Sequence, residues 1–422
     1  MKWHPSLGYS DEGFDLAAPE FFDPARQKFG QARVLHPVAY RSKAFADLED
    51  EKIWTRAWVC VGMQERIPGY GDLLPYTVGN HGIHVQRDDR GQLQGRFNKA
   101  QHGGCRTIPL QCQTGKKTKC SFTSCGYSRD RDAMSAAELN DSAPAMGQYL
   151  GFNPAKLVPI KVETWGPFVF VNLDREARTL AEQFDGLTDK IGCCSQRYRR
   201  IGRRDVEPAS NWKIVGRNFL NGSRLPSMEN LAGPVGSHPE LPVENAANSY
   251  WLYEADIPDA LATIMNGVPA FGEEGAADRR AKFCWVYPNL LLALLPNHIV
   301  SWIVQPTDQT ACLLHMDVMV RESAKDLTTG SEQKIFSYWL ERTRRDALAA
   351  EGMLTNLLSH AKPEADFASQ ATPAEMPIED NYLAYRAQKY LIDQLLAQHT
   401  YYWNDAYTNP KLAVSPSTRG AS

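Results

Sequence analysis

The residues best suited to metal or redox chemistry are crowded into one short stretch of the chain. Four of the nine cysteines lie just after His102, and they are Cys105, Cys112, Cys120 and Cys125. His102 with Cys105, Cys120 and Cys125 makes a Cys3His set, which can bind zinc, although the close C-x2-C pairs of ordinary zinc sites are missing. Cys105 and Cys125 could equally form a disulfide, or all the thiols could stay free. These three alternatives remain open.

The regions around these residues are predicted from hydrophobic patterns. Residues 43–56 repeat apolar side chains at helical spacing, which predicts a helix. Residues 57–97 show short alternating runs broken by the turn sequences PGYGD and DDRG, as antiparallel strands do. Residues 100–126 follow neither period, so the cysteine-rich stretch is predicted to form paired loops.

The second half of the chain is predicted to hold a larger sheet and two long helices. Residues 162–174 form a strand-like run, and residues 176–200 are expected to be helical. Between residues 245 and 320, long apolar stretches have the length and spacing of antiparallel strands. Apolar side chains recur every three or four positions from Ser331 to Ala349 and from Ile378 to Gln398, which predicts two helices.

Charge and composition exclude some classes of function. The net charge of −3 over 422 residues leaves no basic field for nucleic acid or anionic lipid. No apolar stretch reaches the ~18 residues of a membrane span, and the first residues lack the apolar core of a signal peptide. A cytoplasmic protein of two or three domains is expected, in which the odd number of cysteines favours thiols or metal ligands over a disulfide framework.

Six segments of the chain follow one another in the order and register of a known family. They are IWTRAWVCVG with PGYGD, RDDRGQLQGRFN, TWGPFVFVNLD, NWKIVGRNFL, WVYPNLLLALLPNH and EDNYLAYRAQ. Together they resemble the α-subunits of Rieske non-heme iron ring-hydroxylating oxygenases. The resemblance implies an α+β fold with a Rieske-like small antiparallel β domain and a helix-grip (START-like) antiparallel sheet domain with a long C-terminal helix. It implies an N-terminal helical segment at 1–44, a degenerate Rieske-like domain at 45–160 and a catalytic-type domain at 161–422.

In that family a [2Fe–2S] cluster is held by a C-x-H pair on one loop and a C-x2-H pair on the next. By the resemblance, His102 and Cys120 are the surviving ligands, while Ala100 stands at a cysteine position and Thr123 at a histidine position. A methyl group cannot bind iron, and a hydroxyl is a poor substitute for imidazole. The resemblance therefore implies that the cluster is absent or incomplete.

The second centre of the family is a mononuclear Fe(II) bound by two histidines and a carboxylate. Its signature starts with the triplet NWK, which opens the segment NWKIVGRNFL. Counted from there, Arg224 and Glu229 occupy the two histidine positions, and Asn221 occupies the acidic position that couples electron entry from the neighbouring subunit. Asp380 matches the third ligand, with Glu379 as the adjacent alternative. The resemblance implies a degenerate iron site.

Alternatives stay open for these positions. An insertion could bring His238 to the second histidine position, but Gly233 stands five residues before it, so the pair would still be broken. Arg224 and Glu229 could pair with each other or with Asp380 in a buried network, because a buried unpaired charge is unfavourable by several kcal/mol. Arg224 could instead bind an anionic substrate or effector.

Two further histidines, His81 and His84, do not share the even spacing of one strand face. Both are expected at the surface.

With most ligands of both iron centres replaced, the sequence predicts a non-catalytic subunit, or pseudoenzyme, of a hetero-oligomeric Rieske-type oxygenase that supports assembly or substrate access. The expected partner is an active homologous α-subunit in a trimer-based ring, together with the reductase or ferredoxin of that system. Two alternatives remain. One is an oxygenase that hydroxylates or demethylates a small organic substrate with O2 through an unconventional ligand set, and the other is a small-molecule binding protein that uses the helix-grip cavity.

Overall fold

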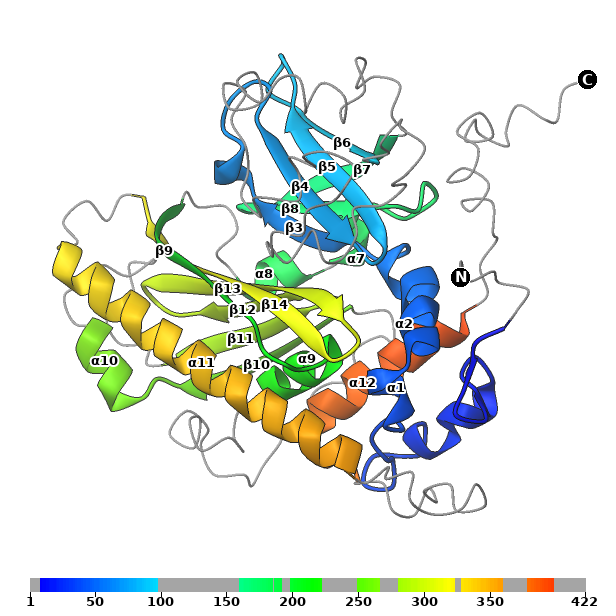
Figure 1. Cartoon of the computed structure of the whole chain (residues 1–422). Helices are drawn as coiled ribbons and strands as arrows, with labels where there is room; N and C mark the ends of the chain where they lie inside the picture. Colours follow the sequence, from blue (N-terminus) through cyan, green and yellow to red (C-terminus); the bar gives the residue numbers. More distant parts are fainter. Residues whose placement is uncertain are drawn as a thin grey trace, which may run out of the picture.

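Two antiparallel sheets, each of six strands, dominate the computed structural model, and most helices gather around the second sheet (Figure 1). The model describes residues 8–97, 159–184, 186–191, 198–221, 249–265, 280–322, 328–359 and 378–397. This arrangement confirms the predicted α+β class, with a small antiparallel β unit beside a larger sheet that is packed against long helices.

The small sheet is built largely from hairpins, as the alternating runs of the sequence predict. At the β4–β5 turn Gly79 has a φ of 55°, and a Cβ there would lie 1.8 Å from a carboxylate oxygen of Asp50. Only glycine therefore allows this turn to lie so close to Asp50. In the order β3-β8-β7-β6-β5-β4, the strands are β3 (Val59–Met63), β8 (Phe168–Asn172), β7 (Pro159–Trp165), β6 (Leu93–Phe97), β5 (His81–Arg87) and β4 (Leu73–Val78).

Strands β7 and β8 pair within the small sheet, β7 with β6 and β8 with β3. The predicted boundary at residue 160 falls inside β7. The division of the chain into 1–44, 45–160 and 161–422 stays a prediction.

The histidines of β5 are buried, so their predicted surface position is wrong. Strand β5 lies between β4 and β6, and side chains on both of its faces are covered. His81 Nε2 lies 3.1 Å from Asp50 Oδ2, and burial lowers the pKa of His84 to about 3, which keeps that ring neutral.

The large sheet has the order β10-β11-β12-β13-β14-β9, in which β10 to β14 follow one another as a meander and β9 pairs with β14 at the far edge. Residues 198–200, the end of the stretch expected to be helical, begin β9. The strands are β9 (Tyr198–Val206), β10 (Tyr250–Asp256), β11 (Arg280–Val286), β12 (Leu290–Leu294), β13 (His298–Asp308) and β14 (Ala311–Arg321).

Two helices lie close against the large sheet because glycine makes room for aromatic rings. A Cβ on Gly202 of β9 would lie 2.2 Å from the Phe336 ring of α11 (Thr329–Ser359). A Cβ on Gly216 of α9 (Trp212–Leu220) would lie 2.4 Å from the Trp285 ring of β11. Among the described helices, none is long and apolar enough to cross a membrane.

The N-terminal helices pack beside the last described helix, α12 (Tyr382–Leu396) (Figure 1). Ser42 caps α2 by accepting a hydrogen bond from Phe45 N at 3.2 Å, and Asn381 caps α12 by accepting one from Ala384 N at 2.9 Å. The helices predicted at 43–56, 331–349 and 378–398 are thus confirmed, although the second continues to Ser359 and the other ends move by a few residues. The remaining elements are β1 (Ser10–Asp11), β2 (Phe14–Asp15), η2 (Pro19–Ala25), α1 (Val38–Arg41), α2 (Lys43–Glu49), the π-helical turn η3 (Asp50–Trp54), η4 (Gln64–Arg66), α7 (Leu180–Gln183), α8 (Leu187–Ile191) and α10 (Asp259–Met265).

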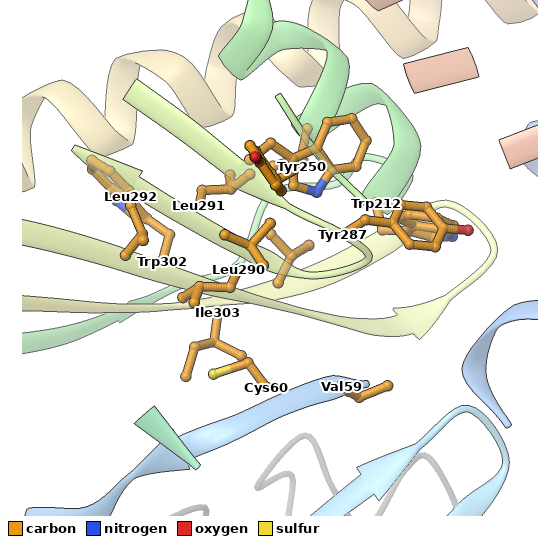
Figure 2. Packing of buried hydrophobic residues seen from close by; sticks show 14 of the residues in the cluster. Val59, Cys60, Trp212, Tyr250, Tyr287, Leu290, Leu291, Leu292, Trp302 and Ile303 are labelled. Atoms are coloured by element: carbon orange, nitrogen blue, oxygen red, sulfur yellow. The ribbon is translucent and has the colours of Figure 1, made fainter. Parts of the chain in front are cut away.

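The two sheets are joined by one side-chain amide. Asn289, in the turn between β11 and β12, accepts a hydrogen bond from Cys60 N at 2.9 Å and donates one to Cys60 O at 2.8 Å. Figure 2 shows Cys60 of β3 directed toward the part of the large sheet that carries Leu290 and Ile303. Asn289 is fully buried, and the backbone N–H and C=O of Cys60 need hydrogen-bond partners where water is excluded. The amide of Asn289 supplies both partners in place of a neighbouring strand.

Candidate functional site

A cavity of about 40 Å³ lies between the large sheet and the helices α9 and α11. One water molecule needs about 10–15 Å³ of such cavity volume, so the space suits a few waters or part of a small ligand. Its lining consists of Val215, Asn218 and Phe219 of α9, Phe283, Leu291, Trp302 and Leu314 of the sheet, and Trp339, Arg342, Thr343, Asp346 and Ala347 of α11.

The lining follows from the spacing of residues along each element. On α9 the three contributions are three and four residues apart, so they lie on one face of the helix. The five contributions of α11 repeat the same spacing over two turns. Most of this face is apolar, but Arg342 and Asp346 place charge within it.

A chain of hydrogen bonds fixes the aromatic wall. Trp302 Nε1 donates to Thr343 Oγ1 at 2.8 Å, and Thr343 Oγ1 donates to Trp339 O at 2.7 Å. Trp339 Nε1 donates to His298 Nε2 at 2.7 Å, which leaves the proton of the neutral ring on Nδ1, 2.7 Å from Asn297 Oδ1. Burial lowers the pKa of His298 to about 3, so the ring is neutral at physiological pH.

The guanidinium of Arg342 is the unusual group of the cavity. The residue is 6% exposed, and its Nε lies 3.5 Å from Asp346 Oδ2. Within the described part of the chain, neither of its Nη nitrogens has a hydrogen-bond partner. Asn218 donates from Nδ2 to Asp346 O at 3.2 Å, while its buried Oδ1 has no partner among the same residues. The cavity therefore presents both an unsatisfied cationic donor and an unsatisfied neutral acceptor.

Two buried ion pairs connect α9 with other elements. Lys213 Nζ lies 2.6 Å from Glu49 Oε1, and Trp212 Nε1 donates to Glu49 Oε2 at 3.2 Å. Burial raises the pKa of Glu49 and lowers that of Lys213, and their contact opposes both shifts. Arg217 Nε lies 2.7 Å from Glu379 Oε2, and Glu379 is fully buried. Each carboxylate is thus neutralised by a basic residue of α9.

Of the predicted site residues, the structure describes Asn221 and Asp380. Asn221 is buried at the C-terminal end of α9. Asp380 is exposed, whereas the adjacent Glu379 points inward to Arg217. Their assignment to the iron site stays a prediction. The other predicted positions lie outside the described residues, namely Ala100, His102, Cys105, Cys112, Cys120, Thr123, Cys125, Arg224, Glu229 and His238.

Of the three positions that the family resemblance assigns to the mononuclear iron, the structure describes one, Asp380. Such a site needs two imidazoles and a carboxylate around one point. Across the ranges that the structure describes, no three histidine, cysteine, aspartate or glutamate side chains come together to hold a metal. The inward-facing carboxylate next to the predicted third ligand, Glu379, already faces a guanidinium.

Sequence reasoning missed Arg342 and Asn218. Arg342 belongs to the charged run ERTRRD, in which no single arginine stands out. A signal was present, because Arg342 lies three residues after Trp339 and five before Ala347, on the apolar face of the predicted helix. A charge on such a face must have a partner or a ligand.

Several curated relatives of this chain are named as monooxygenases. Residues 251–393 match the family model of the ring hydroxylating alpha subunit (catalytic domain). A chloroplastic choline monooxygenase of Atriplex hortensis is 25% identical over 303 residues, which cover 68% of this chain and 63% of the relative. A carnitine monooxygenase oxygenase subunit of Escherichia coli K12 is 20% identical over 331 residues, covering 77% of this chain and 83% of the relative. The match thus spans less than two thirds of the length of the plant relative.

Solved structures share the fold over most of the chain. A quaternary ammonium Rieske monooxygenase covers 90% of this chain and 99% of its own, with a TM-score of 0.57 and 17% identity. The naphthalene 1,2-dioxygenase from Rhodococcus sp. covers 91% of this chain and 100% of its own, with a TM-score of 0.58 and 13% identity. The motifs and the catalytic-domain model matched by residues 251–393 agree, and the chain is therefore similar to the Rieske-type ring-hydroxylating oxygenase α-subunits, whose fold it shares.

Proposed function

We propose that this chain works within a Rieske-type oxygenase system, where its cavity receives a small organic molecule. The cavity between α9, α11 and the large sheet carries this proposal. It is walled by Phe219, Phe283, Trp302 and Trp339, and the hydrogen bonds of Trp302 and Trp339 hold the wall in one geometry. Relatives named as choline and carnitine monooxygenases support hydroxylation or demethylation as the reaction of the system.

In this family the [2Fe–2S] cluster and the mononuclear Fe(II) supply electrons and activate dioxygen. His102 and Cys120 remain the proposed cluster ligands, and Asp380 the proposed third ligand of the mononuclear site. The described residues would contribute by binding the organic molecule. Aromatic side chains exclude water from the bound molecule, and the polar groups of α9 and α11 orient it.

One observation favours a second candidate, in which this chain is a non-catalytic subunit of the system. Glu379, the alternative third iron ligand, forms an ion pair with Arg217 at 2.7 Å, so its carboxylate neutralises a guanidinium and not a metal ion. The replacement of ligand types at Ala100, Thr123, Arg224 and Glu229 agrees with this role. An active homologous α-subunit in a trimer-based ring, with its reductase or ferredoxin, would then supply the chemistry.

Anaerobic purification with and without a ligand-complete homologous α-subunit separates the two candidates. Iron content, the EPR spectrum of the reduced protein and turnover with a reductase are measured for each preparation. Turnover by this chain alone, with bound iron, supports oxygenation on its own site. Turnover only in a mixed complex supports the non-catalytic subunit. A stable homo-oligomer that has no turnover in either preparation contradicts membership of an oxygenase system.

A further inference from the structure

We infer that the cavity recognises a small organic acid, with Arg342 as the counter-ion of its carboxylate. The inference rests on the proposed function only in taking this cavity as the binding site. It adds the residues of this chain that would recognise the ligand, and the charge that the ligand must carry. Three features of the cavity support it, namely the buried cation of Arg342, the buried acceptor of Asn218 and the aromatic wall.

The charge of Arg342 calls for an anion. The residue is buried, and its contact with Asp346 uses only Nε, at 3.5 Å. The two Nη nitrogens lack partners among the described residues. A buried cation with unsatisfied donors is unfavourable, and a carboxylate fits two adjacent N–H groups of a guanidinium in a bidentate manner. The guanidinium carbon also lies 5.6 Å from the centre of the Trp339 ring, so packing against the indole helps to hold the fork in place.

Asn218 adds a second requirement. Its Nδ2 is occupied by Asp346 O, and this bond fixes the amide so that Oδ1 is the free group. A buried carbonyl oxygen of this kind accepts a hydrogen bond from a hydroxyl or an N–H group. A ligand that carries such a donor as well as a carboxylate satisfies both polar groups of the cavity.

The rest of the lining selects the body of the ligand and rejects other ions. Phe219, Phe283 and Trp302 offer apolar surface to a ring or an alkyl chain. A cation without a carboxylate, such as choline, would bring positive charge toward the open side of Arg342. A phosphate would bring more charge than a single, already half-paired guanidinium neutralises.

Calorimetric titration of the full chain with matched acids and amides tests the inference. The probes are acetate, benzoate and 4-hydroxybenzoate, with benzamide as the neutral isostere and choline as the cation. We expect at least one carboxylate to bind, benzoate to bind about tenfold or more tightly than benzamide, and choline not to bind. Arg342→Gln should abolish the preference for the acid. Arg345→Gln, on the exposed side of the same helix where Arg345 pairs with Glu341 at 3.1 Å, should leave it unchanged.

The comparison of benzoate with benzamide uses the unaltered chain, so it tests the preference for a carboxylate even if Arg342→Gln does not fold. Equal affinities for the two, tighter binding of choline, or no binding of any carboxylate at millimolar concentration would each overturn the inference. So would an unchanged preference for the acid in a folded Arg342→Gln variant. Calorimetry needs neither iron nor a reductase, so a failure here is distinct from a failure of the oxygenase proposal, which is measured by turnover.

Discussion

At the scale of single residues, the charges around α9 show how the fold tolerates ionised groups in its interior. Glu49 and Glu379 are both buried, and each lies within 2.7 Å of a basic side chain of α9. Desolvation makes such a pair a weak source of net stability, but removal of one partner leaves the other charge uncompensated. The pairs therefore fix the position of α9 more than they add to the free energy of unfolding.

Lys213→Met should be strongly destabilising. The substitution leaves Glu49 buried without its cation, and we expect a loss of about 3–5 kcal/mol in the free energy of unfolding by urea titration. Adding Glu49→Gln should recover most of this loss, because no buried charge then remains. Lys43→Met is the control, since Lys43 is exposed where it pairs with Asp47, and it should change stability by less than about 1 kcal/mol. A loss of the same size in both lysine variants would contradict this explanation.

His298 should make the protein sensitive to acid. Its pKa is about 3 in the folded chain against 6.5 when exposed, so the unfolded chain binds a proton that the folded one does not. This contribution is fully present above pH 6.5 and is lost as the pH falls toward 3, by about 1.4 kcal/mol per pH unit. His298→Gln keeps an acceptor for Trp339 but cannot titrate. Urea titrations between pH 7 and pH 4 should give a shallower loss for this variant, and parallel curves would argue against the assignment.

At the scale of helices and strands, close packing depends on missing side chains as well as on present ones. Gly216 lets α9 approach Trp285, and Gly202 lets α11 approach β9 through Phe336. These contacts set the width of the space between the helices and the sheet. They therefore also set the depth of the cavity.

Two glycine substitutions within helices should have opposite effects. Gly216→Ala should destabilise the fold by about 1–3 kcal/mol, because its methyl group would lie 2.4 Å from Trp285 and overpacking outweighs the gain in helix propensity. Gly352→Ala, in the exposed part of α11 with no atom within 4 Å of the new methyl group, should stabilise by about 0.5–1 kcal/mol. Thermal unfolding of both variants checks the pair. A stabilising Gly216→Ala would mean that Trp285 moves freely.

The same scale shows what the sequence can predict. Periodicity is sufficient for α11, α12 and the meander, because each buries a regular apolar pattern. It fails for β9, whose sequence YRRIGRRDV has no apolar alternation. That strand is stabilised by partners that only the fold supplies, since Arg199 lies 2.7 Å from Glu332 and Arg200 lies 3.0 Å from Glu65.

Site residues are harder to predict for a related reason. Glu379 and Asp380 are adjacent carboxylates, and the way the chain enters α12 decides which of them points inward. The need of Arg342 for a partner likewise depends on the distance between two helices, which no local pattern contains. His81 and His84 were misplaced because strand alternation separates two faces but does not show that both are covered.

For the molecule as a whole, the proposed second candidate makes a spectroscopic prediction. On this candidate, the purified chain should lack the visible absorption and the reduced-state EPR signal of a Rieske cluster, because the family resemblance assigns Ala100 and Thr123 to two of the four ligand positions. Ala100→Cys combined with Thr123→His should restore both signals after anaerobic reconstitution, whereas either substitution alone should not. A Rieske-type signal in the unaltered chain would show that another ligand set holds the cluster.

The amide of Asn289 also bears on how such a protein can be recombined. Its two hydrogen bonds to Cys60 need only a backbone N–H and C=O on the β3 side, so the residue type at position 60 is unimportant to them. For these two bonds the requirement for a specific side chain falls on the large sheet. In a chimaera, the small sheet of a homologue should therefore keep both bonds to Asn289 whatever residue it carries at position 60. The reverse exchange joins this small sheet to the large sheet of a homologue, and it would need an asparagine at the position of Asn289. Without that asparagine, the backbone N–H and C=O of residue 60 in β3 would lack these hydrogen bonds.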